Sequence, residues 1–140
     1  MFTNLEHLGL AVQDLTAATS LYTSLLGTPP YKQEHVASEG VDTVFFQVGG
    51  SKIELLAGTT PESAITKYLS KKGEGIHHVA FEVQDIYAEM VRLRAEGFTL
   101  LNEEPKRGAD NKLVCFVHPK SAAGVLVELC QEIRGEAPRS

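Results

Sequence analysis

Apolar and polar residues alternate along one short segment of the chain, and the same pattern recurs in its second half. Residues 7–15 are His-Leu-Gly-Leu-Ala-Val-Gln-Asp-Leu, and residues 78–86 are His-Val-Ala-Phe-Glu-Val-Gln-Asp-Ile. Alternation with a period of two predicts β-strands. Near the end of each segment stands an Asp, and the residue after it begins a stretch with apolar residues at helical spacing. The chain is therefore predicted to be one module written twice.

The first module is expected to begin with a strand at residues 4–12 and a helix that Asp14 caps and Gly27 ends. Its further strands are predicted near 31–36, 41–48 and 52–57, and a linker helix at 61–72 follows. The second module repeats this order with a strand at 76–83, a helix at 86–96, and strands near 98–101, 113–118 and 124–130. A flexible loop is expected at 102–111.

This order of elements predicts an α+β fold in which two tandem βαβββ modules form a curved mixed sheet. The modules, residues 4–57 and 75–133, are expected to be related by pseudo-twofold symmetry. A chain of 140 residues fits a single domain, here residues 1–133, because a separate module of under 70 residues would be marginally stable. Residues 134–140 are expected to be a polar tail.

Each half carries one His and one Glu at places where a strand should be apolar. His7 shares a strand face with Gly9, and His78 shares one with Ala80, so small residues leave space beside each imidazole. Glu54 and Glu128 interrupt apolar strand faces, where a carboxylate is costly unless it is paired or bound to a metal.

Pseudo-twofold symmetry would bring these four side chains together. Imidazole and carboxylate groups suit a borderline divalent cation, and cobalt, manganese, nickel and zinc all tolerate them. The metal ligands are therefore predicted to be His7, Glu54, His78 and Glu128. On an octahedral ion they would leave two positions for a bidentate substrate.

The remaining histidines and cysteines receive no chemical role. Cys115 and Cys130 are expected to be small buried residues because they lack a metal-binding or redox spacing. His77 is on the strand face opposite His78 and is expected to be structural or partly exposed. The other two histidines, His35 and His118, are expected at the surface or in loops.

The net charge of −5 argues against nucleic acid or an anionic membrane as a main partner, because both are bound through clustered Lys and Arg. The sequence has no run of about 18 apolar residues and no signal-peptide pattern at its amino terminus. A soluble, cytoplasmic protein is therefore expected.

Three segments carry a resemblance to a known family. They are Gly-Glu-Gly-Ile-His-His-Val-Ala-Phe-Glu-Val (73–83), Asn-Glu-Glu-Pro-Lys (102–106) and His-Pro-Lys-Ser-Ala-Ala-Gly-Val-Leu-Val-Glu-Leu (118–129). With the paired His strands, the chain resembles the vicinal oxygen chelate superfamily, which includes glyoxalase I and extradiol dioxygenases. The three segments resemble its methylmalonyl-CoA epimerase family in particular.

The resemblance implies a divalent metal held by the same four ligands, an acyl-CoA substrate and a homodimer. It also implies inversion at C2 of methylmalonyl-CoA through an enolate. Some relatives have Gln where Glu54 stands. Part of the family carries a Glu, proposed as a base, after a Gly-Val pair, but here Gly40-Val41-Asp42 leads to Thr43.

Inversion needs a proton donor or acceptor on both faces of a planar intermediate. The hypothesis is that Glu128 serves as a base as well as a ligand, with Glu54 or a water as its counterpart. An acidic protein must hold the phosphates of coenzyme A locally. Candidate substrate-binding residues in the second module's loops are Lys106, Arg107, Lys120 and Ser121.

The same residues are also compatible with other functions. A glyoxalase I-like lyase or isomerase would use similar ligands and similar proton transfer. An extradiol dioxygenase is disfavoured because it would prefer two His and one carboxylate. A non-catalytic module that binds a small molecule has no need of four polar ligands.

Overall fold

The computed structural model describes residues 1–133, and the polar tail expected at 134–140 lies outside the described residues. The helices are α1 (Leu15–Leu26), α2 (Ala64–Lys72) and α3 (Ile86–Ala95). The strands are β1 (Phe2–Ala11), β2 (Lys32–Val36), β3 (Val41–Val48), β4 (Ser51–Gly58), β5 (Gly75–Val83), β6 (Lys106–Gly108), β7 (Lys112–Val117) and β8 (Val127–Glu132). Short 3-10 segments occupy Ala37–Glu39, Ala109–Asn111 and Pro119–Ala122.

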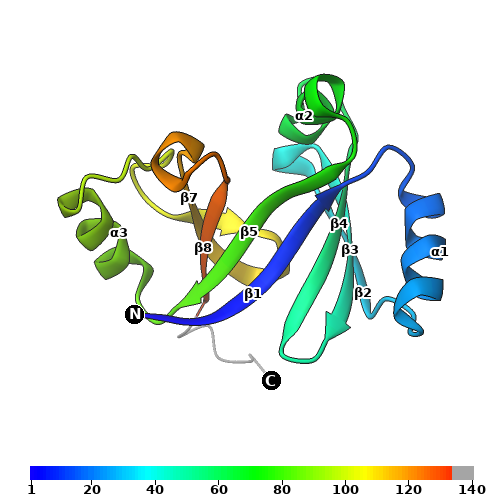
Figure 1. Ribbon diagram of the computed structural model, residues 1–140, viewed down its shortest axis with the longest axis horizontal. Helices are drawn as coiled ribbons and strands as arrows, with labels where there is room; N and C mark the ends of the chain where they lie inside the picture. The colour runs from blue at the N-terminus through cyan, green and yellow to red at the C-terminus, as the bar shows by residue number, and fades with distance from the viewer. Residues whose placement is uncertain (134–140) are drawn as a thin grey trace. The chain divides into compact units, whose positions relative to one another are not determined.

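The strands are hydrogen-bonded in the order β2-β3-β4-β1-β5-β8-β7-β6 (Figure 1). Strand β1 pairs with β4 in parallel, whereas β3 and β4 are antiparallel, so the sheet is mixed. Along the chain, β1-α1-β2-β3-β4 and β5-α3-β6-β7-β8 repeat one order of elements. The predicted α+β fold built from two βαβββ modules is confirmed.

The described chain forms two compact units. The first unit is Glu6–Val79, and the second combines Met1–Leu5 with the chain from Ala80 onward. Both boundaries lie inside strands, so β1 and β5 contribute residues to each unit.

Helix α1 covers one sheet face of the first unit. Its start is fixed by Asp14, whose side chain accepts a hydrogen bond from the Ala17 backbone N–H at 3.0 Å. Its end is fixed by Gly27 in the left-handed region, as predicted. The helix packs on buried apolar residues of this face, Val12, Val44, Phe46 and Leu55.

Helix α2 packs on the opposite face of the same unit. Ser63 caps it by accepting a hydrogen bond from the Ile65 N–H, so the helix begins a few residues after the expected start at 61. Its Ile65 and Leu69 contact residues of the sheet, Ala11, Val41 and Leu56. Because side chains alternate along a strand, Ala11 shares its face with His7. The helix expected as a linker therefore also covers part of the face that carries the predicted ligands.

In the second unit, α3 packs against β7 and β8. Asp85 caps this helix by accepting a hydrogen bond from the Ala88 N–H at 3.1 Å. The apolar cluster beneath the helix contains Ile86, Met90, Leu93, Cys115, Val117 and Leu129. Both cysteines are buried, as expected, and both are thiols outside any disulfide.

Two expectations for this unit were wrong. The strand expected at 98–101 is reduced to a bridge between Leu100 and Val117, because the chain is still leaving the helix where the Phe98 N–H binds the Leu93 carbonyl. The expected flexible loop at 102–111 contains strand β6, which pairs with β7. The charged sequence of this segment does not predict a strand, but β7 provides hydrogen-bond partners for its backbone.

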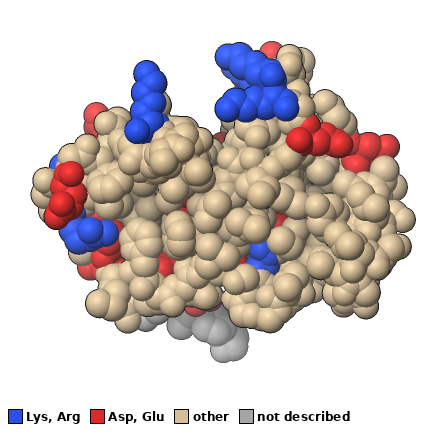
Figure 2. Space-filling model, viewed as in Figure 1, with Lys and Arg blue, Asp and Glu red and all other residues tan. Residues whose placement is uncertain are grey.

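The surface carries charges of both signs. On the face drawn in Figure 2, basic and acidic side chains form separate small groups on a largely uncharged surface. Within residues 1–133, none of the helices combines the length and apolar character that a membrane crossing requires.

Candidate metal centre

Three of the four predicted metal ligands converge within the first unit. They come from separate strands, His7 from β1, Glu54 from β4 and His78 from β5. The parallel register of β1 and β4 sets Gly9 opposite Glu54 and His7 opposite Lys52. Because alternate residues share a face, this register directs His7 and Glu54 to the same side of the sheet.

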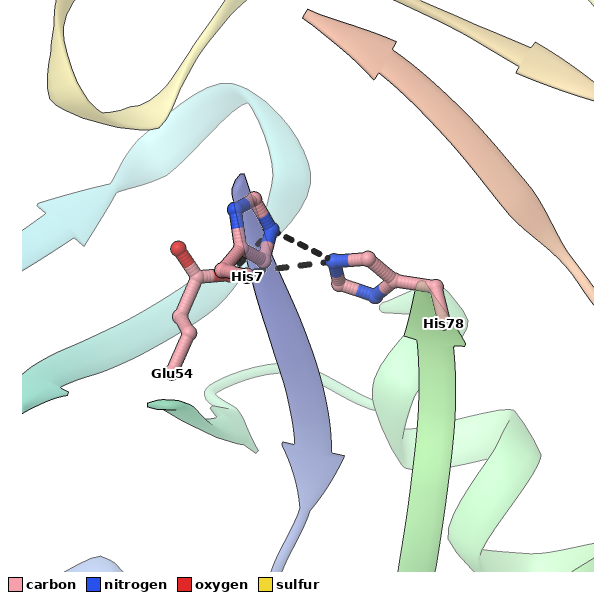
Figure 3. A group of neighbouring side chains, drawn as sticks. All are labelled: His7, Glu54 and His78. Atoms are coloured by element: carbon pink, nitrogen blue, oxygen red, sulfur yellow. Dashed lines mark hydrogen bonds and ion pairs between the residues drawn. The ribbon is translucent and has the colours of Figure 1, made fainter. Parts of the chain in front are cut away.

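The three side chains are buried and their donor atoms are close together (Figure 3). His7 Nε2 lies 2.9 Å from His78 Nε2, and Glu54 Oε1 lies 3.8 Å from the first nitrogen and 4.0 Å from the second. Two atoms bound to one ion at about 2.1 Å stand at most about 4.2 Å apart. All three pairs satisfy this limit, so the residues fit a single cation.

Gly9 makes room for the His78 ring. A Cβ atom at this position would lie 2.1 Å from His78 Cε1, closer than any van der Waals contact allows. The structure thus agrees with the expectation that a small residue leaves space beside an imidazole. It adds that the space beneath Gly9 is used by the histidine of the other sequence repeat.

A carboxylate and an ammonium group lie directly behind His7. Glu6 accepts a hydrogen bond from His7 Nδ1 at 2.8 Å and from Lys52 Nζ at 2.6 Å. Burial alone would raise the pKa of Glu6, but the hydrogen bonds and charges of His7 and Lys52 outweigh it and lower the pKa to about 2. Sequence reasoning missed both residues, because only the strand register places Lys52 beside His7.

His77 lies next to the second imidazole. Its Nδ1 is 3.0 Å from His78 Nδ1, and its ring meets the Tyr68 ring edge-on with centroids 4.9 Å apart. Tyr68 in turn donates its hydroxyl proton to the Ile76 carbonyl. His77 is half-buried, as expected, but it also contacts a predicted ligand, which alternation along the strand did not suggest.

The fourth predicted ligand, Glu128, belongs to the second unit. It is buried on β8, opposite Phe116 of β7, and shares its strand face with Cys130. Burial first, and then the charge of Glu128, raise the pKa of the Cys115 thiol to about 11. The role of Glu128 as a metal ligand stays a prediction.

The predicted substrate-binding residues also lie in the second unit. Lys106 and Arg107 are on β6, where the Arg107 guanidinium donates to Asn111 Oδ1 at 3.1 Å. Lys120 and Ser121 are in the short 3-10 segment, and Ser121 Oγ accepts a hydrogen bond from the Thr99 N–H. Contact of these four residues with a substrate stays a prediction.

Thr43, where some relatives carry a Glu, has no capacity to act as a carboxylate base. It is buried on β3, and its hydroxyl donates to the Glu34 carbonyl at 3.1 Å.

Paired βαβββ modules with buried histidine and carboxylate groups on a strand face define a protein of the glyoxalase-like class. Comparison with known proteins supports this class. The profile of the glyoxalase/bleomycin resistance protein/dioxygenase superfamily matches residues 6–116.

Individual relatives indicate which family of this superfamily the chain belongs to. The chain is 41% identical to the ethylmalonyl-CoA/methylmalonyl-CoA epimerase of Cereibacter sphaeroides, over 94% of this chain and 99% of that protein. The crystal structure of methylmalonyl-CoA epimerase from Mycobacterium tuberculosis superposes with a TM-score of 0.90 at 36% identity, covering 94% of this chain and 89% of that one. A methylmalonyl-CoA epimerase solved in complex with methylmalonyl-CoA and NH4+ gives a TM-score of 0.91 at 34% identity, covering 99% and 100%. The chain therefore belongs to the glyoxalase superfamily and, within it, to the methylmalonyl-CoA epimerase family.

Proposed function

We propose that this protein is an epimerase that interconverts the C2 epimers of methylmalonyl-CoA with the help of a divalent cation. The observation that carries the proposal is the buried His7, Glu54 and His78 cluster, in a chain that matches an epimerase of Cereibacter sphaeroides along nearly its whole length. The solved epimerase complex with methylmalonyl-CoA supports this substrate.

The chemistry of the substrate explains why ligands of this kind are needed. The C2 proton lies between a thioester and a carboxylate, and the adjacent carboxylate repels the negative charge that forms when the proton leaves. A bound divalent cation would supply Lewis-acid stabilisation of that charge. His7, Glu54 and His78 would hold the cation, and Glu128 is proposed as the fourth ligand.

Inversion requires proton transfer on both faces of the planar intermediate. Because Thr43 provides no carboxylate, we assign the bases to the two predicted glutamates. Glu128 takes or returns the proton on one face, and Glu54 or a water does so on the other. Lys106, Arg107, Lys120 and Ser121 are proposed to hold the coenzyme A portion.

The activity is tested by assaying the metal-loaded protein for two reactions, C2 epimerisation of methylmalonyl-CoA and isomerisation of the methylglyoxal–glutathione adduct. We expect epimerisation alone, its loss after chelation, and its recovery when the cation is restored. Turnover of the glutathione adduct without epimerisation would instead indicate a glyoxalase. Activity in neither assay, with the cation bound, would contradict both assignments and favour a binding module.

The bases are tested by deuterium exchange at C2 in the variants Glu128→Gln and Glu54→Gln, with metal content measured in each. We expect at least one variant to hold metal and lose exchange on one epimer. If both exchange at the parental rate while holding metal, neither glutamate is the base.

Three further parts of the proposal have direct measurements. Elemental analysis of the purified protein identifies which of cobalt, manganese, nickel or zinc it carries. Light scattering coupled to size exclusion tests the proposed homodimer. Cell fractionation tests the proposed cytoplasmic location.

A further inference from the structure

We propose that Glu6 and Lys52 are positioning residues that fix His7 in the tautomer whose Nε2 lone pair faces the cation site. The inference rests on the proposed function only in treating His7 as a metal ligand. Both residues belong to the first unit together with His7.

The hydrogen bonds of Glu6 determine the proton on His7. An ionised carboxylate only accepts hydrogen bonds, so the 2.8 Å contact from Glu6 Oε1 requires a proton on His7 Nδ1. A neutral imidazole with a proton on Nδ1 has its lone pair on Nε2, the atom that lies near His78 and Glu54. Glu6 thereby selects the ligand form of His7.

Lys52 holds the carboxylate in this orientation. Its Nζ lies 2.6 Å from Glu6 Oε2, so the two carboxylate oxygens are divided between Lys52 and His7. The side chains of Glu6 and Lys52 are only 8% and 17% exposed, and a buried carboxylate without a cation is costly. Lys52 stands opposite His7 in the β1–β4 register, so the pairing of the two strands sets this arrangement.

On its Nδ1 side, the second imidazole contacts another imidazole. His78 Nδ1 contacts His77 Nδ1 at 3.0 Å, and an imidazole nitrogen serves as donor or acceptor according to its tautomer. With His7 Nε2 as an acceptor, the proton in the 2.9 Å contact between the imidazoles belongs to His78. To bind a cation through Nε2, His78 would have to change tautomer or give up this proton.

The first test is made on the parental, metal-free protein. Nitrogen-15 NMR of the histidine side chains distinguishes the two tautomers of each ring. We expect His7 to be protonated on Nδ1 and unprotonated on Nε2. A proton on His7 Nε2 instead would overturn the proposal, whatever activity the protein shows.

The second test uses Glu6→Gln. Lys52 should attract the amide oxygen, which leaves the amide NH2 group facing His7 and moves the ring proton to Nε2. The dissociation constant for Co2+, followed by its visible absorption, should then rise about 10- to 100-fold, as for other residues that support a metal-binding His. In the double variant Glu6→Gln/Lys52→Met, the amide oxygen is released to face His7, so the Nδ1 proton and part of the affinity should return.

Asp42→Asn is the matched control. Asp42 Oδ1 lies 2.6 Å from His35 Nδ1, but this pair of side chains is about half exposed, so its loss should leave Co2+ affinity and the His7 tautomer unchanged. Circular dichroism confirms that each variant is folded. If folded Glu6→Gln keeps the parental tautomer and binds Co2+ as tightly as the parent, the proposal is wrong. If Glu6→Gln does not fold, the NMR result on the parental protein decides it alone.

Discussion

Gly9 illustrates how a single absent side chain shapes the candidate metal centre. The imidazole of His78 occupies the volume that a Cβ of residue 9 would fill. The backbone of Gly9 is outside the left-handed region, so its conformation does not require glycine. A glycine is needed at this position because the His78 ring approaches it closely. Its replacement should therefore disturb the ligand rather than the path of β1.

We expect Gly9→Val to displace the His78 ring and to weaken Co2+ binding about 10-fold or more, a loss on the scale of disturbed ligand support. Gly50→Val is the control, because a Cβ at Gly50 would have open space around it. Calorimetric titration with Co2+ measures both affinities. Equal affinities in the two variants would show that the site adapts to the added side chain.

The cysteines give a second prediction at the residue scale. Cys115 and Cys130 are 0% and 1% exposed, and the pKa of Cys115 is raised to about 11. Because the thiolate is the reactive form, neither thiol should react with a disulfide reagent at pH 8 in the folded protein. Both should react in urea. Rapid modification without denaturant would contradict the burial of these residues.

At the scale of elements, the helices α1 and α3 of the two modules both begin with an Asp that caps the helix. Asp14 and Asp85 each accept a hydrogen bond from the backbone N–H three residues later. This contact satisfies one of the N–H groups left unpaired at a helix start. Helices α1 and α3 then pack on separate apolar clusters, one in each unit.

We expect Asp14→Ala and Asp85→Ala each to lower the free energy of unfolding by about 1 kcal/mol, because the capping acceptor is lost. The substitutions Asp14→Asn and Asp85→Asn retain an acceptor and should cost far less. Urea unfolding of all four variants makes the comparison. Equal losses for Ala and Asn would mean that charge, and not the capping bond, supports these helices.

At the scale of the whole molecule, acid should destabilise the metal-free protein through Glu6. Its pKa falls from 4.5 in the unfolded chain to about 2 in the folded protein. A lowered pKa stabilises the fold above pH 4.5, and this contribution is lost as the pH falls from 4.5 toward 2. The shift corresponds to about 3 kcal/mol at most.

The free energy of unfolding, measured in urea at several values between pH 5 and pH 2.5, should therefore fall with decreasing pH. It should fall less steeply in Glu6→Gln, which has no carboxylate to protonate at this position. Parallel curves for the two proteins would contradict the assigned pKa. Asp42→Asn, which alters the exposed pair, should follow the parental curve.

The sequence alone determined the repeated order of elements, because alternation, helical spacing and capping residues are local signals. It correctly placed α1 between Asp14 and Gly27, and β3 at 41–48. It also singled out His7, Glu54 and His78, which the structure brings together, because each is a polar residue on an otherwise apolar or small-residue strand face. The repeat supported their prediction as metal ligands, because the same residue types recur at matched places in both halves.

Only the tertiary structure decided which groups surround these candidate ligands. Lys52 reaches Glu6 because β4 lies parallel to β1 in one particular register, and a shift by one residue would turn Lys52 to the other face. The charged segment that contains β6 likewise becomes a strand only because β7 supplies its hydrogen bonds. Local periodicity does not determine how distant strands pair. The sequence therefore predicted the candidate ligands, and the fold placed Glu6 and Lys52 beside one of them, His7.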